Sequence, residues 1–143
     1  MKKIIQLAVF SILGLATYTQ AQTNRPVLDI MLTNYEYPYQ VHYLNLKSQT
    51  DDLKMAYMDI KPTKTNGKTV VLLHGKNFNG AYWKTTIEAL TKEGYRVVVP
   101  DQIGFGKSSK PTDYQYSFQQ LAQNTKAILD ELKINKVYLL GHS

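Results

Sequence analysis

The chain has 143 residues, enough for about one domain, and it contains no cysteine, which excludes disulfide bonds, thiol chemistry and cysteine-based metal sites. A total of 17 Lys and Arg residues against 11 Asp and Glu residues gives a formal net charge of +6. The lysines are scattered along the chain, which favours a solvated basic surface over a groove for nucleic acid.

The first 21 residues have the pattern of a secretory signal. Lys2 and Lys3 precede an apolar run over Ile4–Leu15. The small residues that end at Ala21 suit cleavage of the chain directly after Ala21. The run is shorter than the roughly 20 residues that a membrane-spanning helix needs. We therefore expect an exported, periplasmic or secreted protein with no stable membrane anchor after cleavage. An uncleaved N-terminal anchor is the alternative.

Residues 22–38 are predicted to form an irregular lead-in, whose polar first part we expect to be mobile. Two β-rich runs follow, Val41–Lys47 and Leu53–Ile60. The polar stretch Ser48–Asp52 between them predicts the loop of a β-hairpin.

The next segment has the pattern of a strand, a helix and a strand. The apolar run Thr69–Leu73 is typical of a parallel strand buried on both faces, and it ends in His74-Gly75. Ala81–Lys92 predicts a helix with apolar residues at i, i+4 and i+7 and Gly94 as its C-terminal cap. Arg96–Val99 predicts a second buried strand.

A loop rich in Gly, Ser and Pro, Asp101–Tyr114, precedes a second predicted helix. Ser117 begins this helix, and Gln120 three residues later completes a capping box. The apolar stripe of the helix comprises Phe118, Leu121, Ile128, Leu129 and Leu132. Val137–Leu140 predicts a third buried strand, and Gly141-His142-Ser143 follows it.

This order of elements predicts an α/β fold. An N-terminal antiparallel hairpin leads into a mostly parallel sheet. The strands after the hairpin alternate with helices, so right-handed crossovers make them parallel and place helices on both faces of the sheet. The last predicted strand has no helix after it, which would leave one face of the sheet uncovered. We therefore expect the chain to be the N-terminal part of a larger domain.

Three predicted loops leave the carboxyl ends of the strands, where open α/β sheets place their sites. They contain the motifs His74-Gly75, then Asp101-Gln102-Ile103-Gly104-Phe105-Gly106-Lys107-Ser108, then Leu139-Leu140-Gly141-His142-Ser143. Over residues 39–143 the chain resembles the α/β-hydrolase fold family, in which these motifs occur in this order and on these elements. The resemblance implies structural roles for His74, Gly75, Asp101, Gly104, Gly106, Ser108 and Gly141.

The resemblance implies that Ser143 is the catalytic nucleophile. The family carries this serine in G-x-S-x-G on a sharp strand-to-helix turn, and Gly141 and Ser143 match the first part of that motif. Relatives that dehalogenate or open epoxides resemble this stretch but carry Asp at the nucleophile position. Serine favours attack on an acyl carbon through an acyl-serine intermediate, so we expect a small-molecule ester, thioester or amide as substrate.

A serine nucleophile needs a histidine base and a carboxylate that orients the base, and in this family both follow the serine in the chain. His142 is adjacent to Ser143 and His42 lies in the hairpin, so neither suits the role of base. Asp101 is implied to brace its loop. We expect the 143-residue chain to be inactive by itself.

The resemblance also implies an oxyanion donor, a backbone N–H in the residue just after His74-Gly75. That residue is Lys76, with Asn77 as the alternative, because Lys76-Asn77-Phe78 departs from the sequences that many relatives have there. The competing interpretation of Lys76 is an ordinary exposed lysine in a strand-ending turn.

No cofactor and no metal are expected. Gly104–Ser108 fails as a phosphate-binding P-loop because Asp101 stands where that motif needs its first glycine, and Lys110-Pro111 blocks the helix that a dinucleotide fingerprint requires. Two alternatives to a serine hydrolase remain open. One is a non-catalytic α/β-hydrolase-like binding protein, and the other is a C–C hydrolase or a cofactor-free haloperoxidase-like enzyme with the same triad.

Overall fold

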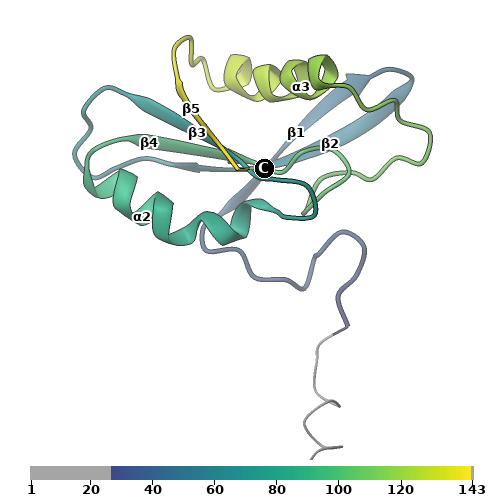
Figure 1. The fold of residues 1–143 in the computed structure, drawn as a ribbon, viewed down its shortest axis with the longest axis horizontal. Coiled ribbons are helices and arrows are strands. Elements are labelled where there is room, and N and C mark those ends of the chain that lie inside the picture. The colour runs from purple at the N-terminus through teal and green to yellow at the C-terminus, as the bar shows by residue number, and fades with distance from the viewer. Residues whose placement is uncertain (1–26, 143) are drawn as a thin grey trace, which may run out of the picture.

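The computed structural model describes residues 27–142, so the predicted signal peptide and Ser143 lie outside the described residues. The elements are β1 (Val41–Ser48), β2 (Asp51–Ile60), β3 (Thr69–Leu73), the 3-10 helix η1 (Gly80–Trp83), α2 (Lys84–Lys92), β4 (Arg96–Pro100), α3 (Phe118–Glu131) and β5 (Tyr138–Gly141). They follow one another in the predicted order (Figure 1). Within this range, no helix has the length and apolar character needed to cross a membrane.

One five-stranded sheet, in the order β1-β2-β4-β3-β5, carries the fold. β2 is antiparallel to both of its neighbours, β1 and β4, whereas β3 is parallel to β4 and to β5. β2 therefore runs against the other strands, which share one direction. The predicted α/β class, with an antiparallel hairpin leading into parallel strands, is confirmed.

The turn of the β1–β2 hairpin is shorter than predicted. Only Gln49 and Thr50 stand outside the strands, because Ser48 already pairs with Asp51. Gln49 adopts a positive φ of 57°, which a tight two-residue turn demands. The polar Ser48 is buried in its strand, and a hydrogen bond of 2.7 Å with the hydroxyl of Tyr114 compensates for the loss of water around its own hydroxyl.

The two α-helices cover opposite faces of the sheet (Figure 1). Side chains alternate along β3, so that Val70 and Leu72 pack with Ile87 of α2. Val71, which lies between them, packs with Ile128 of α3. The buried cluster on the α2 side comprises Met58, Val70, Leu72, Trp83, Ile87, Val97 and Val99. The cluster on the α3 side comprises Leu53, Met55, Tyr57, Val71, Val98, Ile103, Tyr114 and Ile128.

Both helical segments begin at a side-chain cap. Asn79 Oδ1 accepts a hydrogen bond from the Ala81 N–H at 2.9 Å, and the segment predicted as one helix is divided into η1 and α2. Ser117 Oγ accepts from the Gln120 N–H at 3.1 Å, as the predicted capping box requires. The Gln120 side chain instead donates to Asn124 Oδ1 at 3.0 Å, so the box is half formed.

Apolar side chains are exposed at two places within the described residues, in the first turn of α3 and in β5. Phe118, in the first turn of α3, is 89% exposed although its spacing places it on the same stripe as Leu121 and Leu129. In β5, Leu139 is 65% exposed and Leu140 is 43% exposed. β5 pairs with β3 on one side only among residues 27–142, so the expectation of a buried strand is wrong for this part of the chain.

The described part of the lead-in is irregular, as expected, but it is anchored to the loop that follows β4. Lys107 Nζ donates to the Leu32 carbonyl oxygen at 2.7 Å and lies 5.1 Å from the centre of the Tyr37 ring. The Tyr37 hydroxyl donates to the Asp101 carboxylate at 2.6 Å. These contacts connect the lead-in to the loop after β4, and the expected mobility of its first part stays a prediction.

Candidate active site

The carboxyl ends of three parallel strands bring the predicted motifs to one edge of the sheet. β3 ends before His74-Gly75, β4 ends before Asp101, and β5 ends at Gly141. The His142 N–H donates to the Leu73 carbonyl oxygen at 3.0 Å, so the chain leaving β5 runs beside the end of β3. The end of the described chain lies at the centre of the view in Figure 1.

Asp101 lies beneath this edge, is only 1% exposed and contacts several segments of the chain. Its carboxylate accepts three hydrogen bonds, from the Gly80 N–H at 2.6 Å, the Lys107 N–H at 2.7 Å and the Tyr37 hydroxyl at 2.6 Å. Such donors stabilise a carboxylate that burial would otherwise disfavour. Asp101 thus connects the lead-in, the start of η1 and the loop after β4, which are the contacts of a brace.

The loop after β4 has glycine where no side chain fits. Gly106 adopts a φ of 53°, and a β-carbon there would collide with the Asp101 carboxylate, while Gly104 adopts a φ of 94°. Ser108 is fully buried, and its hydroxyl donates to the Asp101 carbonyl oxygen at 2.7 Å while accepting from the Ala56 N–H at 2.8 Å. These contacts fix the loop against β2.

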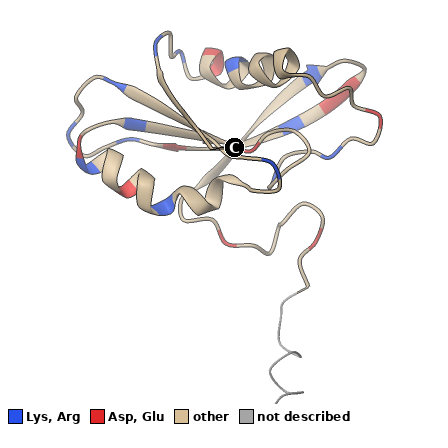
Figure 2. Cartoon of the chain, in the orientation of Figure 1, with Lys and Arg blue, Asp and Glu red and all other residues tan. Residues whose placement is uncertain are grey.

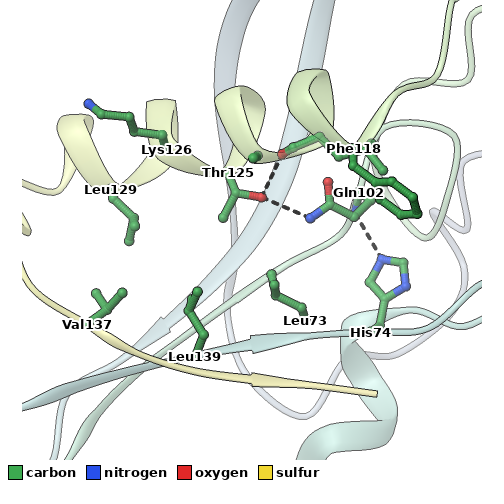
Figure 3. Close-up of a pocket in the computed structure, with 11 residues that line it drawn as sticks. Leu73, His74, Gln102, Phe118, Thr125, Lys126, Leu129, Val137 and Leu139 are labelled. Atoms are coloured by element: carbon green, nitrogen blue, oxygen red, sulfur yellow. Dashed lines mark hydrogen bonds between the residues drawn. The ribbon is translucent and has the colours of Figure 1, made fainter. Parts of the chain in front are cut away.

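Both ring nitrogens of His74 are engaged (Figure 3). Nε2 lies 2.9 Å from the Gln102 backbone N, and a backbone N–H can only donate, so Nε2 is the acceptor. The ring proton is therefore on Nδ1, which lies 2.9 Å from the Gly75 carbonyl oxygen. Since its accepting nitrogen is occupied, His74 connects the ends of β3 and β4 and is not available to take a proton from a serine.

The predicted oxyanion donors stand in a tight turn. The Phe78 N–H donates to the Gly75 carbonyl oxygen at 3.2 Å, and Asn77 between them adopts a φ of 67°. Lys76 and Asn77 are exposed, and within residues 27–142 no hydrogen bond uses the backbone N–H of either residue. Both N–H groups therefore remain available to an oxyanion.

No histidine of the described residues is placed as a general base. His42 packs against Tyr57 in the hairpin, across the sheet from β5. The His142 ring lies among aromatic side chains, with Nδ1 3.2 Å from the hydroxyl of Tyr82, and burial raises the pKa of Tyr82. Within the same residues, no group of three or more His, Cys, Asp or Glu side chains is arranged to hold a metal ion.

A cavity of about 780 Å³ opens beside these loops. It is lined by His74, Gly75, Lys76, Gln102, Gly104, Phe105, Tyr116, Phe118, Leu121 and His142. The lining is largely apolar, has one cationic side chain and no carboxylate, and is typical of a small-molecule site. Over the molecule as a whole, basic and acidic residues are spread over several elements (Figure 2).

A second groove, of about 410 Å³, runs between α3 and β5 (Figure 3). Leu73, Leu129 and Leu139 give it an apolar lining, and it shares His74 and Gln102 with the first cavity.

Two side chains near the candidate site were not identified from the sequence. Burial, and after it the charge of Asp101, raises the pKa of Tyr37, which stays protonated as a donor. Nothing in the lead-in marks Tyr37, because its partner lies 64 positions away. Gln102 carries a buried amide, and its place directly after Asp101 in the loop motif was the available signal.

Comparisons with known proteins agree with this geometry. The family model described as the alpha/beta hydrolase fold matches residues 68–143. A haloalkane dehalogenase of Mycobacterium marinum is 36% identical over 72% of this chain and 35% of its own length. A putative non-heme chloroperoxidase of Synechocystis is 34% identical over 54% of this chain and 28% of its own.

Among solved structures, a probable hydrolytic enzyme of Pseudomonas aeruginosa PAO1 is similar at 52% identity and a TM-score of 0.81, over 82% of this chain and 38% of that one. The chain spans about a third of the length of the relatives it matches.

Proposed function

The chain belongs to the alpha/beta hydrolase fold family, and from that premise we propose that the full-length protein is a serine hydrolase with Ser143 as its nucleophile. Its substrates are esters, thioesters or amides. The observation that carries the proposal is the hydrogen bond of 3.0 Å from the His142 N–H to Leu73. This bond holds the chain that leads to position 143 beside the end of β3, directly before the His74-Gly75 motif and the Lys76-Asn77 turn.

In the proposed reaction, Ser143 Oγ attacks the carbonyl carbon of the substrate, and the hydroxyl proton passes to a general base. The tetrahedral intermediate then loses its leaving group, which takes up that proton, and the acyl group stays on the serine. Water attacks this acyl-serine, and its proton returns by way of the base to Ser143 as the acid departs.

The turn after β3 supplies the stabilisation that the first step needs. The carbonyl oxygen gains negative charge as the tetrahedral intermediate forms, and backbone N–H groups that are already fixed in place lower the energy of that charge. Lys76 is our first assignment for this donor and Asn77 the second, since both N–H groups are available among the described residues.

The serine at position 143 also determines which reactions of the relatives we propose for this protein. A serine that displaced halide from a saturated carbon would be left as an ether, which has no carbonyl carbon for water to attack. A serine on an acyl carbon forms an ester, which water cleaves. We therefore assign acyl chemistry, and not dehalogenation, to a chain with serine at position 143.

The base and the carboxylate that orients it are proposed to come from outside residues 27–142. His74 is engaged at both nitrogens, and the His142 ring is held by Tyr82. The buried carboxylate of Asp101 accepts from three donors within the protein.

A fluorophosphonate probe tests the proposal on the full-length protein. We expect covalent labelling of the wild type and none of Ser143→Ala. The substitution should lower kcat by several orders of magnitude and leave roughly 10³-fold catalysis over water from binding and the oxyanion donors.

Ser117→Ala is the matched control, because it removes a serine hydroxyl at the start of α3 and should leave labelling intact. Normal turnover by Ser143→Ala would exclude this nucleophile. A folded full-length protein that neither reacts with the probe nor hydrolyses acyl esters would favour the non-catalytic binding protein.

A second candidate is a cofactor-free haloperoxidase-like activity at the same serine. It is favoured by the 34% identity to the putative non-heme chloroperoxidase. Halogenation of a reporter dye in the presence of a carboxylic acid, hydrogen peroxide and halide, lost in Ser143→Ala, would support it, because hydrogen peroxide would cleave the acyl-serine to a peracid that oxidises the halide.

We also propose that the protein is exported and that its mature form starts at Gln22, on the pattern of its first 21 residues. N-terminal sequencing of the soluble extracytoplasmic protein measures this directly. Met1 at the N-terminus of that material would contradict it.

A further inference from the structure

The ring of His142, the residue directly before Ser143, contacts three aromatic side chains. Its centre lies 5.5 Å from the ring centre of Phe78, 5.7 Å from that of Tyr82 and 6.4 Å from that of Trp83. Phe78 and Tyr82 also contact each other at 5.2 Å, and Tyr82 stacks on Trp83 at 4.7 Å. All these separations lie within the range of about 4.5–7 Å over which aromatic rings attract each other. We call these four rings the aromatic cluster.

Tyr82 makes a polar contact with His142 in addition to the contact between the rings. Its hydroxyl lies 3.2 Å from Nδ1 of His142. Burial raises the pKa of Tyr82, and the backbone of Gly75 acts in the opposite direction, so the hydroxyl keeps its proton at neutral pH. The His142 N–H donates to the Leu73 carbonyl oxygen at 3.0 Å. The residue before Ser143 is therefore held at its backbone by β3 and at its ring by Tyr82.

Tyr82 belongs to η1, whose first residues are fixed against β4 and the loop that follows it. The Asn79 side chain caps η1, and the Gly80 N–H donates to the Asp101 carboxylate at 2.6 Å. A β-carbon at Gly80 would lie only 3.0 Å from Val99, so the backbone there packs closely on β4. This anchoring gives Tyr82 a fixed position from which it can hold a residue of another segment.

Phe78 connects the aromatic cluster to the turn that carries the proposed oxyanion donors. Its N–H donates to the Gly75 carbonyl oxygen and closes that turn, while its ring packs on His142. Among the described residues, His142 lines the candidate active-site cavity, whereas Phe78 and Tyr82 do not. The cluster thus joins the oxyanion turn to the chain that leads to the proposed nucleophile, and it does so from outside the cavity.

We propose that Tyr82 is a positioning residue, whose hydroxyl holds the His142 ring and so fixes Ser143 relative to the oxyanion donors. The inference rests on the proposed serine hydrolase. Attack on a carbonyl carbon needs the nucleophile and the oxyanion donors at defined distances from the same carbonyl group. A displacement of about 1 Å can lower the rate about 10²-fold. Tyr82 therefore acts on the position of Ser143, through His142, and not on the substrate.

Tyr82→Phe in the full-length protein removes the hydroxyl and keeps the ring. Complete reaction with a fluorophosphonate probe counts the active molecules, so kcat for 4-nitrophenyl butyrate is expressed per labelled site and is corrected for misfolded protein. We expect kcat and the rate constant of labelling each to fall about tenfold with KM within about twofold, because position and not binding changes. Tyr43→Phe is the matched control, since Tyr43 is exposed on β1 at the other edge of the sheet, and it should leave all three values unchanged.

A double-mutant cycle tests whether Tyr82 acts through His142. His142→Phe keeps a ring in the aromatic cluster but removes Nδ1, so adding Tyr82→Phe to it should change kcat by less than about twofold. An equal loss in both backgrounds, a loss confined to KM, or a normal kcat in Tyr82→Phe overturns the inference and leaves the proposed function standing. A folded wild-type protein that shows neither labelling nor hydrolysis overturns the proposed function as well.

Discussion

Asp101 and Tyr37 are 64 positions apart in the chain, yet the Tyr37 hydroxyl donates to the Asp101 carboxylate at 2.6 Å. Two backbone N–H groups complete the set of donors around that carboxylate. A carboxylate that loses one donor while it stays buried still bears the cost of desolvation. The loss of one donor therefore lowers the stability by more than the net contribution of one hydrogen bond. The position of the loop after β4 therefore depends on a few individual side chains.

Tyr37→Phe removes one of these donors and keeps the ring. We expect the free energy of unfolding of the full-length protein to fall by about 2 kcal/mol near neutral pH, since hydrogen bonds to charged groups contribute roughly 1.5–3 kcal/mol. Chemical denaturation measures this change. Tyr43→Phe, in an exposed side chain of β1, is the control and should have little effect.

The same bond predicts a dependence on alkaline pH. Burial and the Asp101 charge raise the pKa of Tyr37 above its ordinary value of 10. The folded protein therefore keeps this proton where the unfolded chain releases it, so the stabilisation is complete below about pH 10 and is lost as the pH rises further. Tyr37→Phe should flatten the fall in unfolding free energy above pH 10. An unchanged slope would contradict the assignment.

Helix α3 shows how a local pattern and its tertiary setting differ. The sequence predicts a reciprocal capping box, but Gln120 turns to Asn124, which is buried and also donates to the Tyr114 hydroxyl at 2.9 Å. The cap at Ser117 is retained because it needs only the helix itself. The reciprocal bond is lost because a buried polar network offers Gln120 a better partner.

Ser117→Ala should accordingly lower the free energy of unfolding by about 1 kcal/mol. Gln120→Ala keeps the backbone N–H that Ser117 binds, so it should cost less than Ser117→Ala. Thermal denaturation of the two variants side by side measures the difference. Equal losses would indicate that the complete capping box forms in solution.

The elements that the sequence predicts well are those that local pattern determines. Continuous apolar runs predict β3 and β4, and the spacing of apolar residues predicts α2. The hairpin turn was predicted too long because the partner of Ser48, Tyr114, lies 66 positions later. At the candidate site the three motifs were found from sequence, whereas the amide of Gln102 required knowledge of what surrounds it.

Across the molecule, the sheet ends in two different edges within the described residues, β1 and β5. β5 presents Tyr138, Leu139 and Leu140, each more than two fifths exposed at 52%, 65% and 43%. An apolar strand with unpaired backbone groups along one side is a template for pairing with another chain.

A polypeptide of residues 22–143 should therefore self-associate at micromolar concentration. Leu139→Lys places a charge on this edge and should shift the material towards monomer in analytical ultracentrifugation. Phe118→Lys is the matched control, because Phe118 is still more exposed, at 89%, but stands on a helix. Equal effects of the two substitutions would show that general hydrophobicity, and not the strand edge, drives association.

The order of the strands has a consequence for synthesis. β3 pairs only with β4 and β5 among the described strands, and both are translated after it, while β2 and β1 can close into a hairpin at once. β4 must enter between β2 and β3, so no parallel pair forms until residues 96–100 have left the ribosome. Assembly of the parallel strands therefore waits for β4, whereas the hairpin at the other edge can form alone. Until β4 emerges, β3 has no partner among the described strands and leaves its apolar side chains uncovered.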